Sequence, residues 1–344
     1  MNAPQANALQ GAIHKLAFRE PLTADDAEAA FDIVMQGQAT AVQVAALLSA
    51  LRATGESPEV VAGVVRALRS AMVSLAADDP ENLVDTCGTG GGAVPTFNIS
   101  TAAALVAAGA GVRIAKHGNR SFTSRCGSAD VLEALGVPIE VPVPVMEGAL
   151  REVGIVFMFA PLMHPAMRHV GPVRRELGVQ TVMNMVGPLA NPAHAGRQVV
   201  GVSDPRRLPL IAGALRELDT VHALVVHGDG MDEISPFSST DVVEIRNGQL
   251  TEWKIDPHRY GFGGGVVADL AGGPPADNAA TIIKVLRGDA NEASMAAVAL
   301  NAAAALYAGG AAQSFDEGVE MAKAGIGSGA GLVALERLRA AFTR

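Results

Sequence analysis

The sequence predicts an α/β protein, in which a small all-helical N-terminal domain precedes a larger domain with a mostly parallel central sheet flanked by helices. Three observations indicate this fold class. The first 75 or so residues show only helix patterns and helix caps. From about residue 82, segments typical of strands alternate with segments typical of helices, as they do around parallel sheets. The 344 residues are 49% hydrophobic but only 4% aromatic, so Ala, Val, Leu and Ile must fill the core.

The N-terminal helices are predicted from residues that can cap them. Thr23 precedes two aspartates that favour the first turn of a helix through the helix dipole. Thr40 precedes a second helix with an apolar side. Ser57 is followed by Pro58, a pair typical of the cap and first position of a third helix. The apolar stripe of this third helix is broad enough to pack against a second subunit as well as its own core.

The larger domain is predicted from its alternating segments. We expect strands at 83–84, 112–115, 155–159, 199–202, 223–226 and 242–246. We expect helices at 100–109, 130–136, 147–153, 208–218 and 293–308, and an extended, proline-containing stretch at 137–145. A helical insert at 164–181 interrupts the alternation and would return to complete the N-terminal helices. The expected domains are therefore 1–76 with an insert of about 164–185, and 77–163 with 186–344, with the ligand site in the cleft between them.

A glycine-rich loop at 88–92 lies between the first expected strand and a helix. Its main-chain N–H groups and the N-terminus of the following helix favour a phosphate or diphosphate. Glycine content alone fits a tight turn equally well, and no Walker-type Lys-Ser/Thr pair follows the loop. Asn98, Ser100 and Thr101 offer oxygens to a phosphate or a metal, or serve as helix caps.

A second loop, Lys116-His-Gly-Asn-Arg120, follows the second expected strand, and Arg125 comes just beyond it. In a chain with a net charge of −9, this local cluster of positive charge is expected to neutralise a phosphate ester. His117 by itself is more typical of a hydrogen-bonded structural histidine than of a catalytic one. Asn119 can orient a polar group of a substrate through its amide.

Two further groups come from distant segments. Asp232 and Glu233 follow the strand expected at 223–226, where adjacent carboxylates suit Mg²⁺, although an ordinary acidic turn explains the spacing as well. Arg174 and Arg175 lie on the helical insert and are placed to clamp a carboxylate. For one of these two arginines we expect only a place on the surface of a helix.

Composition limits the classes of function. The net charge of −9 argues against general binding to nucleic acid or to anionic membranes. Cys87 and Cys126 are too few for a disulfide framework and lack the spacing of a metal site, which indicates two reduced thiols in a cytoplasmic protein. Residues 1–7 lack the pattern of a signal peptide, and the most apolar stretch, 293–308, is too short and weak for a membrane span.

Taken together, these motifs resemble the anthranilate phosphoribosyltransferase family of tryptophan biosynthesis. The resemblance covers nearly the whole chain, with several motifs in the same order. Beyond the loops described above, the matching segments are 127–130, 132–136, 164–165, 174–178, Asn184, 187–192 and 300–302. The resemblance implies a homodimer formed through the helical domains, and transfer of the phosphoribosyl group of phosphoribosyl diphosphate (PRPP) to the amine of anthranilate. The products would be N-(5-phosphoribosyl)anthranilate and diphosphate, with Mg²⁺ as the cofactor.

The resemblance also implies roles for individual residues. Those that would bind PRPP are Gly88, Thr89, Gly90, Gly91, Gly92, Thr96, Asn98, Ile99, Ser100, Thr101, Lys116, His117, Gly118, Asn119, Arg120, Ser121, Ser124 and Ser128. Those that would bind anthranilate are Gly88, His117, Asn119 and Arg174, with Arg174 facing the carboxylate. Those that would bind the metal are Ser100, Asp232 and Glu233. No residue is assigned as catalytic.

The sequence departs from the family pattern in three places: Gly92 stands where the glycine loop usually ends in Asp, Gln180 where a basic residue is common, and Arg125-Cys126 where Lys-Ser is usual. Only Gly92 lies directly in the expected site. We expect this change to shift the dependence of the rate on Mg²⁺ and PRPP without abolishing activity. Two alternative functions stay open on the sequence. A pyrimidine nucleoside phosphorylase shares this type of fold and would consume free phosphate. A nucleic-acid-binding relative of the fold would need a broad basic surface, which the net charge disfavours.

Overall fold

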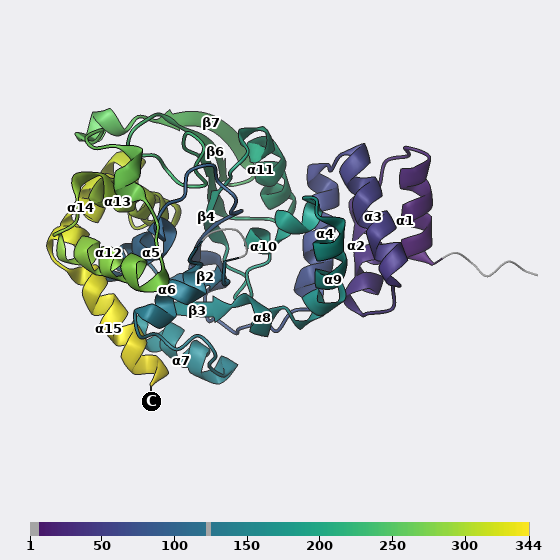
Figure 1. Cartoon of the computed structure of the whole chain (residues 1–344), viewed down its shortest axis with the longest axis horizontal. Helices are drawn as coiled ribbons and strands as arrows, with labels where there is room; N and C mark the ends of the chain where they lie inside the picture. Colours follow the sequence, from purple (N-terminus) through teal and green to yellow (C-terminus); the bar gives the residue numbers. More distant parts are fainter. Residues whose placement is uncertain (1–6, 122–124, 344) are drawn as a thin grey trace, which may run out of the picture.

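A computed structural model describes residues 7–121 and 125–343 of the chain. Its N-terminal part is a bundle of four helices, α1 (Ala8–Ala17), α2 (Ala24–Met35), α3 (Ala41–Thr54) and α4 (Pro58–Ser70). The predicted caps are confirmed, since the side chains of Thr23, Thr40 and Ser57 each accept a main-chain hydrogen bond from the first turn of their helix. Figure 1 shows α1, α2 and α3 at one end of the molecule, with α4 between them and the larger domain.

The larger domain is built on one seven-stranded sheet with the order β3-β2-β1-β4-β5-β6-β7. The strands are β1 (Val84–Gly88), β2 (Ile114–Gly118), β3 (Ile155–Phe159), β4 (Arg197–Gly201), β5 (His222–His227), β6 (Thr240–Arg246) and β7 (Gln249–Ile255). The first five in space are parallel, whereas β6 and β7 are antiparallel additions at one edge. The prediction of a mostly parallel central sheet is therefore confirmed. Strand β7 was not predicted, because most of its side chains are exposed and it carries no apolar run.

The two faces of the sheet pack into different hydrophobic cores. Val199 and Val226 belong to the core beneath α5 (Ile99–Gly109) and the C-terminal helices, whereas Val200 and Val225 belong to the core that contains the helical bundle. The helices not yet bounded on the first side are α6 (Ser128–Ala134), α7 (Val143–Val153), α12 (Pro275–Arg287), α13 (Glu292–Ala308), α14 (Phe315–Gly327) and α15 (Ala330–Phe342). On the other side, α11 (Leu208–Glu217) packs directly on α4. The buried helix predicted at 293–308 is thus confirmed as α13.

The segment expected as a helical insert is a series of short helices. They are α8 (Ala160–Met163), a 3-10 helix at Pro165–His169, α9 (Gly171–Leu177), a 3-10 helix at Val182–Asn184 and α10 (Val186–Leu189). Its apolar side chains, such as Val170 and Val173, share the core of the helical bundle. The exact domain boundaries stay a prediction.

Two expected boundaries were wrong in ways that have physical causes. Strand β2 continues through Lys116 and His117, which were expected to follow the strand. The sequence pattern predicts that the strand ends with its last apolar residue, but the structure provides partners that allow a lysine to be buried in it. The stretch expected to be extended at 137–145 ends early, because α7 begins at Val143 directly after a proline that serves as its N-terminal cap position. Among the described residues, no helix is long and apolar enough to cross a membrane.

Candidate active site

The glycine loop and the acidic pair meet at the carboxyl ends of β1 and β5. The Gly90 N–H donates a hydrogen bond of 2.8 Å to Asp232 Oδ2. This approach requires glycine at two positions, since a side chain at Gly88 would collide with the Asp232 carboxylate and one at Gly201 would collide with the Asp232 carbonyl group. Gly90 and Gly91 also adopt positive φ angles of 70° and 77°. Two loops more than a hundred residues apart in sequence therefore form one surface of amides and carboxylate.

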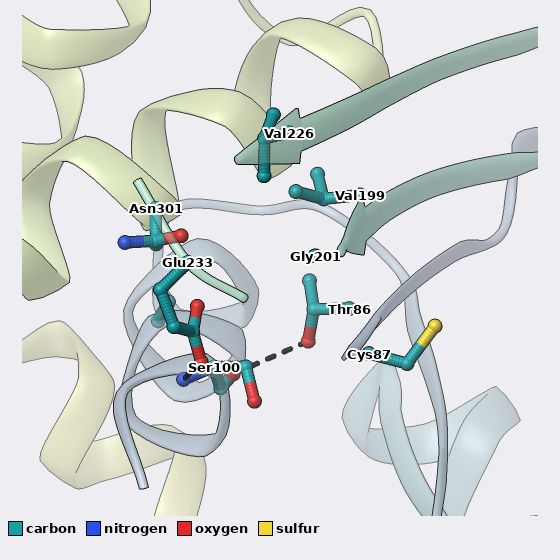
Figure 2. Close-up of a pocket in the computed structure, with 9 residues that line it drawn as sticks. Thr86, Cys87, Ser100, Val199, Gly201, Val226, Glu233 and Asn301 are labelled. Atoms are coloured by element: carbon teal, nitrogen blue, oxygen red, sulfur yellow. Dashed lines mark hydrogen bonds between the residues drawn. The ribbon is translucent and has the colours of Figure 1, made fainter. Parts of the chain in front are cut away.

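Glu233 lies deeper in the same site. Its Oε1 accepts a hydrogen bond of 3.1 Å from the Ser100 N–H, in the first turn of α5. Figure 2 shows Glu233 and Ser100 close together beside Thr86, around a small, largely apolar cavity. Burial raises the pKa of Glu233 to about 8; the negative charge of Asp232 adds to this effect and Lys116 opposes it. Burial also raises the pKa of Asp232.

Lys116 supplies positive charge from beneath this site rather than from its rim. Its side chain is buried, with 3% of the residue exposed. Its Nζ donates to the Thr86 carbonyl oxygen and lies 3.4 Å from Ser100 Oγ. Burial lowers the pKa of Lys116, and the carboxylates of Asp85 and Glu233 oppose this shift. The predicted glycine loop, Ser100, Lys116 and the acidic pair are thus in one place.

The second loop is held by an anchor that the sequence analysis did not identify. Asp85 is fully buried, and its two carboxylate oxygens accept hydrogen bonds from the His117 N–H at 3.1 Å and from Asn191 Nδ2 at 2.7 Å. Burial raises the pKa of Asp85 to about 6, against the opposing effects of Lys116 and these hydrogen bonds. The available signal was an aspartate directly after the apolar residues Leu83 and Val84, since an aspartate that is buried requires partners.

His117 faces a second histidine, His164, with 4.9 Å between the ring centroids. Both rings are buried. Within the described part of the chain, His117 Nε2 has no hydrogen-bond partner, and neither nitrogen of His164 makes a well-formed bond although the Ala190 backbone lies near it. Burial lowers the pKa of His117 to about 3 and that of His164 to about 4, so both imidazoles are neutral at pH 7. His164 was part of a matching motif but was not predicted as a site residue.

The remaining polar residues of the second loop bind the start of α6. Arg120 forms ion pairs of 2.9 Å with Asp130 and 2.6 Å with Glu133, so its charge is already partnered in this structure. The Asn119 carbonyl oxygen accepts a hydrogen bond from Ser128 Oγ at 3.3 Å. Ser121 donates its N–H to Asp130 at 3.2 Å, whereas Ser124 lies outside the described residues. Gly118 ends β2, and a side chain there would collide with Ser128 Oγ.

Several of the predicted contact residues are buried or are engaged elsewhere in the fold. Asn98 bonds the Cys126 carbonyl at 3.2 Å and Asn278 at 2.9 Å. Ile99 and Thr101 are buried at the start of α5, and the Thr101 hydroxyl has no hydrogen-bond partner within the described part of the chain. The other two predicted contacts are Thr89, whose hydroxyl lies 3.4 Å from that of Ser203, and Thr96, which forms an isolated bridge with Ala271.

The two arginines of the insert differ in environment. Arg174 is half-buried on α9, and burial lowers its pKa with no acid contributing. Arg175 is exposed. Helix α9 packs on α3 and on the 3-10 helix at Pro165–His169, so Arg174 belongs to the side of the helical bundle. Burial raises the pKa values of the Cys87 and Cys126 thiols, which indicates that they are unreactive.

Comparisons with known proteins agree along the whole chain. The family model for the helical bundle domain of a glycosyl transferase family matches residues 10–72, and the model for its a/b domain matches residues 80–332. The anthranilate phosphoribosyltransferase of Rubrobacter xylanophilus is 49% identical over 330 residues, which cover 96% of each chain. That of Geobacillus kaustophilus is 46% identical and covers 96% of this chain and 98% of its own.

Solved structures give the same result. The crystal structure of the anthranilate phosphoribosyltransferase from Thermus thermophilus has a TM-score of 0.92 and 42% identity, covering 97% of this chain and 99% of its own. The enzyme from Saccharomyces cerevisiae, in complex with PRPP and Mg, has a TM-score of 0.88 and 27% identity, covering 97% and 98%. The fold predicted from the sequence is therefore confirmed in these relatives.

Proposed function

We propose, since this chain belongs to the anthranilate phosphoribosyltransferase family, that separate groups of residues in its site bind the metal, the diphosphate and anthranilate. The chain is a glycosyltransferase of tryptophan biosynthesis. It transfers the phosphoribosyl group of PRPP to the amine of anthranilate, giving N-(5-phosphoribosyl)anthranilate and diphosphate. The observation that carries our proposal is the hydrogen bond between Gly90 and Asp232, which joins an anion-binding loop to a pair of carboxylates.

The residues of the acidic site fit Mg²⁺. Asp232, Glu233 and the Ser100 hydroxyl are hard oxygen donors, and Mg²⁺ commonly uses one or two carboxylates together with substrate phosphates. Among the described residues no group of three or more His, Cys, Asp or Glu side chains converges, so the remaining ligands would be phosphate oxygens and water. When bound, Mg²⁺ would neutralise the departing diphosphate. The relative from Saccharomyces cerevisiae has been solved with PRPP and Mg.

The glycine loop would hold the diphosphate. The N–H groups of Gly91 and Gly92 and the N-terminus of α5 supply donors and a positive dipole without side-chain bulk, whereas the Gly90 N–H is already donated to Asp232. Lys116 would add a buried positive charge, and the low dielectric constant of its surroundings would strengthen its attraction for the diphosphate. These groups stabilise the charge that develops as the bond from C1′ to diphosphate breaks.

The acceptor side would be formed by His117, Asn119 and Arg174. Arg174 would bind the anthranilate carboxylate, since no acid neutralises it within the described structure. A neutral His117 would orient the amine, with its Nε2 available. The aryl amine is already uncharged at pH 7, so it attacks C1′ through an oxocarbenium-like transition state without a strong base, and positioning supplies most of the rate enhancement.

We further propose a cytoplasmic homodimer that forms through the helical bundle. Helices α1 and α3 lie at the outer end of the molecule (Figure 1). Phe18, the C-cap residue of α1, and Val42, in the first turn of α3, have 67% and 78% of their surface exposed. The two helices pack together. A contiguous exposed apolar patch marks an interaction site, and we propose that these two side chains belong to such a patch. A Val42→Glu substitution is expected to give a monomer in analytical ultracentrifugation, and an unchanged dimer would refute this surface.

Loss of anthranilate fluorescence on mixing with PRPP tests the proposed activity. We expect loss only with the enzyme and Mg²⁺ present, and no loss when EDTA is added. A Lys116→Met variant should reduce kcat by at least about 100-fold, because it removes the buried charge beneath the diphosphate. Phosphorolysis of uridine with free phosphate is the control reaction, and activity there without anthranilate turnover would refute the proposal.

A further inference from the structure

Helix α13 carries one polar side chain where its neighbours are Ala, Val and Leu. Asn301 lies at its centre, and only 3% of the residue is exposed. The helix is buried on nearly all sides, so an amide at this position must find partners or destabilise the fold. Asn301 belongs to a segment that matches the family, but it was not predicted as a site residue and has no role in the proposed function.

The partners of Asn301 are on a distant loop. Its Oδ1 accepts a hydrogen bond of 3.1 Å from the Ile234 N–H, and its Nδ2 donates one of 3.1 Å to the Ile234 carbonyl oxygen. The second hydrogen of Nδ2 is donated to the Ala297 carbonyl at 2.9 Å, one turn earlier in α13. One side chain therefore holds both main-chain polar groups of a single residue, as a neighbouring strand would.

Ile234 directly follows the acidic pair. Its own side chain is fully buried, so the main chain at this point is fixed both by packing and by Asn301. On the other side, Gly228 packs so tightly against the Glu233 carbonyl that a side chain there would collide with it. Figure 2 shows Asn301 beside Glu233, and both line the small cavity together with Ser100.

We propose that Asn301 is a positioning residue, which holds the acidic turn so that Asp232 and Glu233 face the glycine loop and α5. In the ionised form that would bind Mg²⁺, the two adjacent carboxylates repel each other, and this repulsion favours their separation unless the main chain is held. Asn301 restrains that main chain from the rigid centre of a helix. The inference rests on the proposed metal-binding role of the acidic pair.

Two variants of Asn301 and one matched control test this inference. Asn301→Leu keeps the approximate size and removes all three hydrogen bonds. Asn301→Asp keeps an acceptor for the Ile234 N–H but removes the donor to its carbonyl. Ser294→Ala is the control, because Ser294 is a buried polar residue of the same helix whose hydroxyl bonds Asp269, far from the acidic turn.

The first measurement is hydrogen exchange of the Ile234 amide in the protein without ligands. We expect exchange to be at least tenfold faster in Asn301→Leu, while amides at the centres of α5 and β4 keep the wild-type rate. The second is the Mg²⁺ concentration that gives half-maximal rate at saturating PRPP, which should rise at least tenfold, while KM for anthranilate changes less than twofold. Ser294→Ala should match the wild type in both.

A folded Asn301→Leu with wild-type exchange at Ile234 and wild-type Mg²⁺ dependence would overturn the inference. If this variant does not fold, Asn301→Asp decides by the same two readouts. An equal rise in the KM for PRPP and the KM for anthranilate, together with faster exchange throughout the protein, would indicate a general structural role and would also overturn the inference. A wild-type enzyme that needs no Mg²⁺ would instead refute the proposed function.

Discussion

Gly201→Ala is the sharpest perturbation that the site offers. Gly201 ends β4, and its φ is not positive, so alanine is acceptable to its main chain. The difficulty is purely one of space, since the new Cβ would lie well inside 3.0 Å of the Asp232 carbonyl oxygen and 3.2 Å from Asp232 Cα. These are main-chain atoms, which cannot rotate away as the end of a side chain can.

The size of the effect follows from this geometry. Ordinary contact begins at 3.4 Å, so the main chain of Asp232 or of β4 must move by roughly 1 Å or more. Overpacking of this kind costs about 1–3 kcal/mol, and we expect about 3 kcal/mol because rigid backbone lies on both sides. A shift of about 1 Å in the acidic pair should lower kcat/KM for PRPP on the order of 100-fold.

Urea unfolding followed by the fluorescence of Trp253, the only tryptophan, measures the first quantity. The fluorescence loss of anthranilate measures the second. Gly148→Ala is the control, because Gly148 lies within α7 with no atom within 4 Å of a Cβ, and alanine there should stabilise the helix by about 0.5–1 kcal/mol. Wild-type stability and activity in Gly201→Ala would refute the argument that this glycine exists to admit Asp232.

Three further predictions concern the acceptor, the histidine pair and the glycine loop. Arg174→Ala should raise the KM for anthranilate by about 10- to 100-fold, because it removes charge-assisted hydrogen bonds to the carboxylate, and should leave the KM for PRPP unchanged. Steady-state kinetics measure both values, and equal effects on the two substrates would contradict the prediction. NMR should show no titration of His117 or His164 between pH 8 and pH 5, since their pKa values are about 3 and about 4. In the unfolded chain the His164 imidazole binds a proton below about pH 6.5, whereas in the folded protein it stays neutral down to about pH 4. The contribution of neutral His164 to stability is therefore complete above pH 6.5 and is lost as the pH falls. Between pH 6.5 and pH 4, the unfolding free energy of the wild type relative to His164→Gln should fall by up to about 1.4 kcal/mol per pH unit. Gly92→Asp would place a carboxylate beside Asp232, since a Cβ at position 92 lies 3.3 Å from Asp232 Oδ1. This variant should change the Mg²⁺ concentration that gives half-maximal rate by about threefold or more. An unchanged Mg²⁺ titration together with an unchanged KM for PRPP would contradict the prediction.

Much of the fold was predictable because its signals are local. Thr23, Thr40 and Ser57 cap their helices through residues three positions away, and the interaction is written in adjacent sequence. The buried strand β3 is a continuous apolar run, and its bounds were predicted to the residue. The exposed edge strand β7 carries no such run and is defined by pairing with β6.

The site was predictable only in part, for the same reason. Strand ends with glycines and charges indicate where ligands bind in a parallel sheet, so the meeting of Gly90 and Asp232 could be anticipated. The burial of Lys116 could not be anticipated, because it depends on oxygens of Thr86 and Ser100 that reach the lysine through tertiary packing. Asn301 was invisible as a site residue, since its partner is 67 positions away and is a main-chain group.

The shared core of the helical bundle and α11 has a consequence for how this protein can be divided. Helix α4 presents apolar side chains to both the bundle and α11, and Pro58 lies against Gly213 so closely that any side chain on α11 there would collide with it. A cut near residue 76 would strip the cover from α4 and from one face of β4 and β5 at once. We therefore expect the two predicted domains to unfold as one cooperative unit, and a fragment of residues 7–72 to aggregate rather than fold alone.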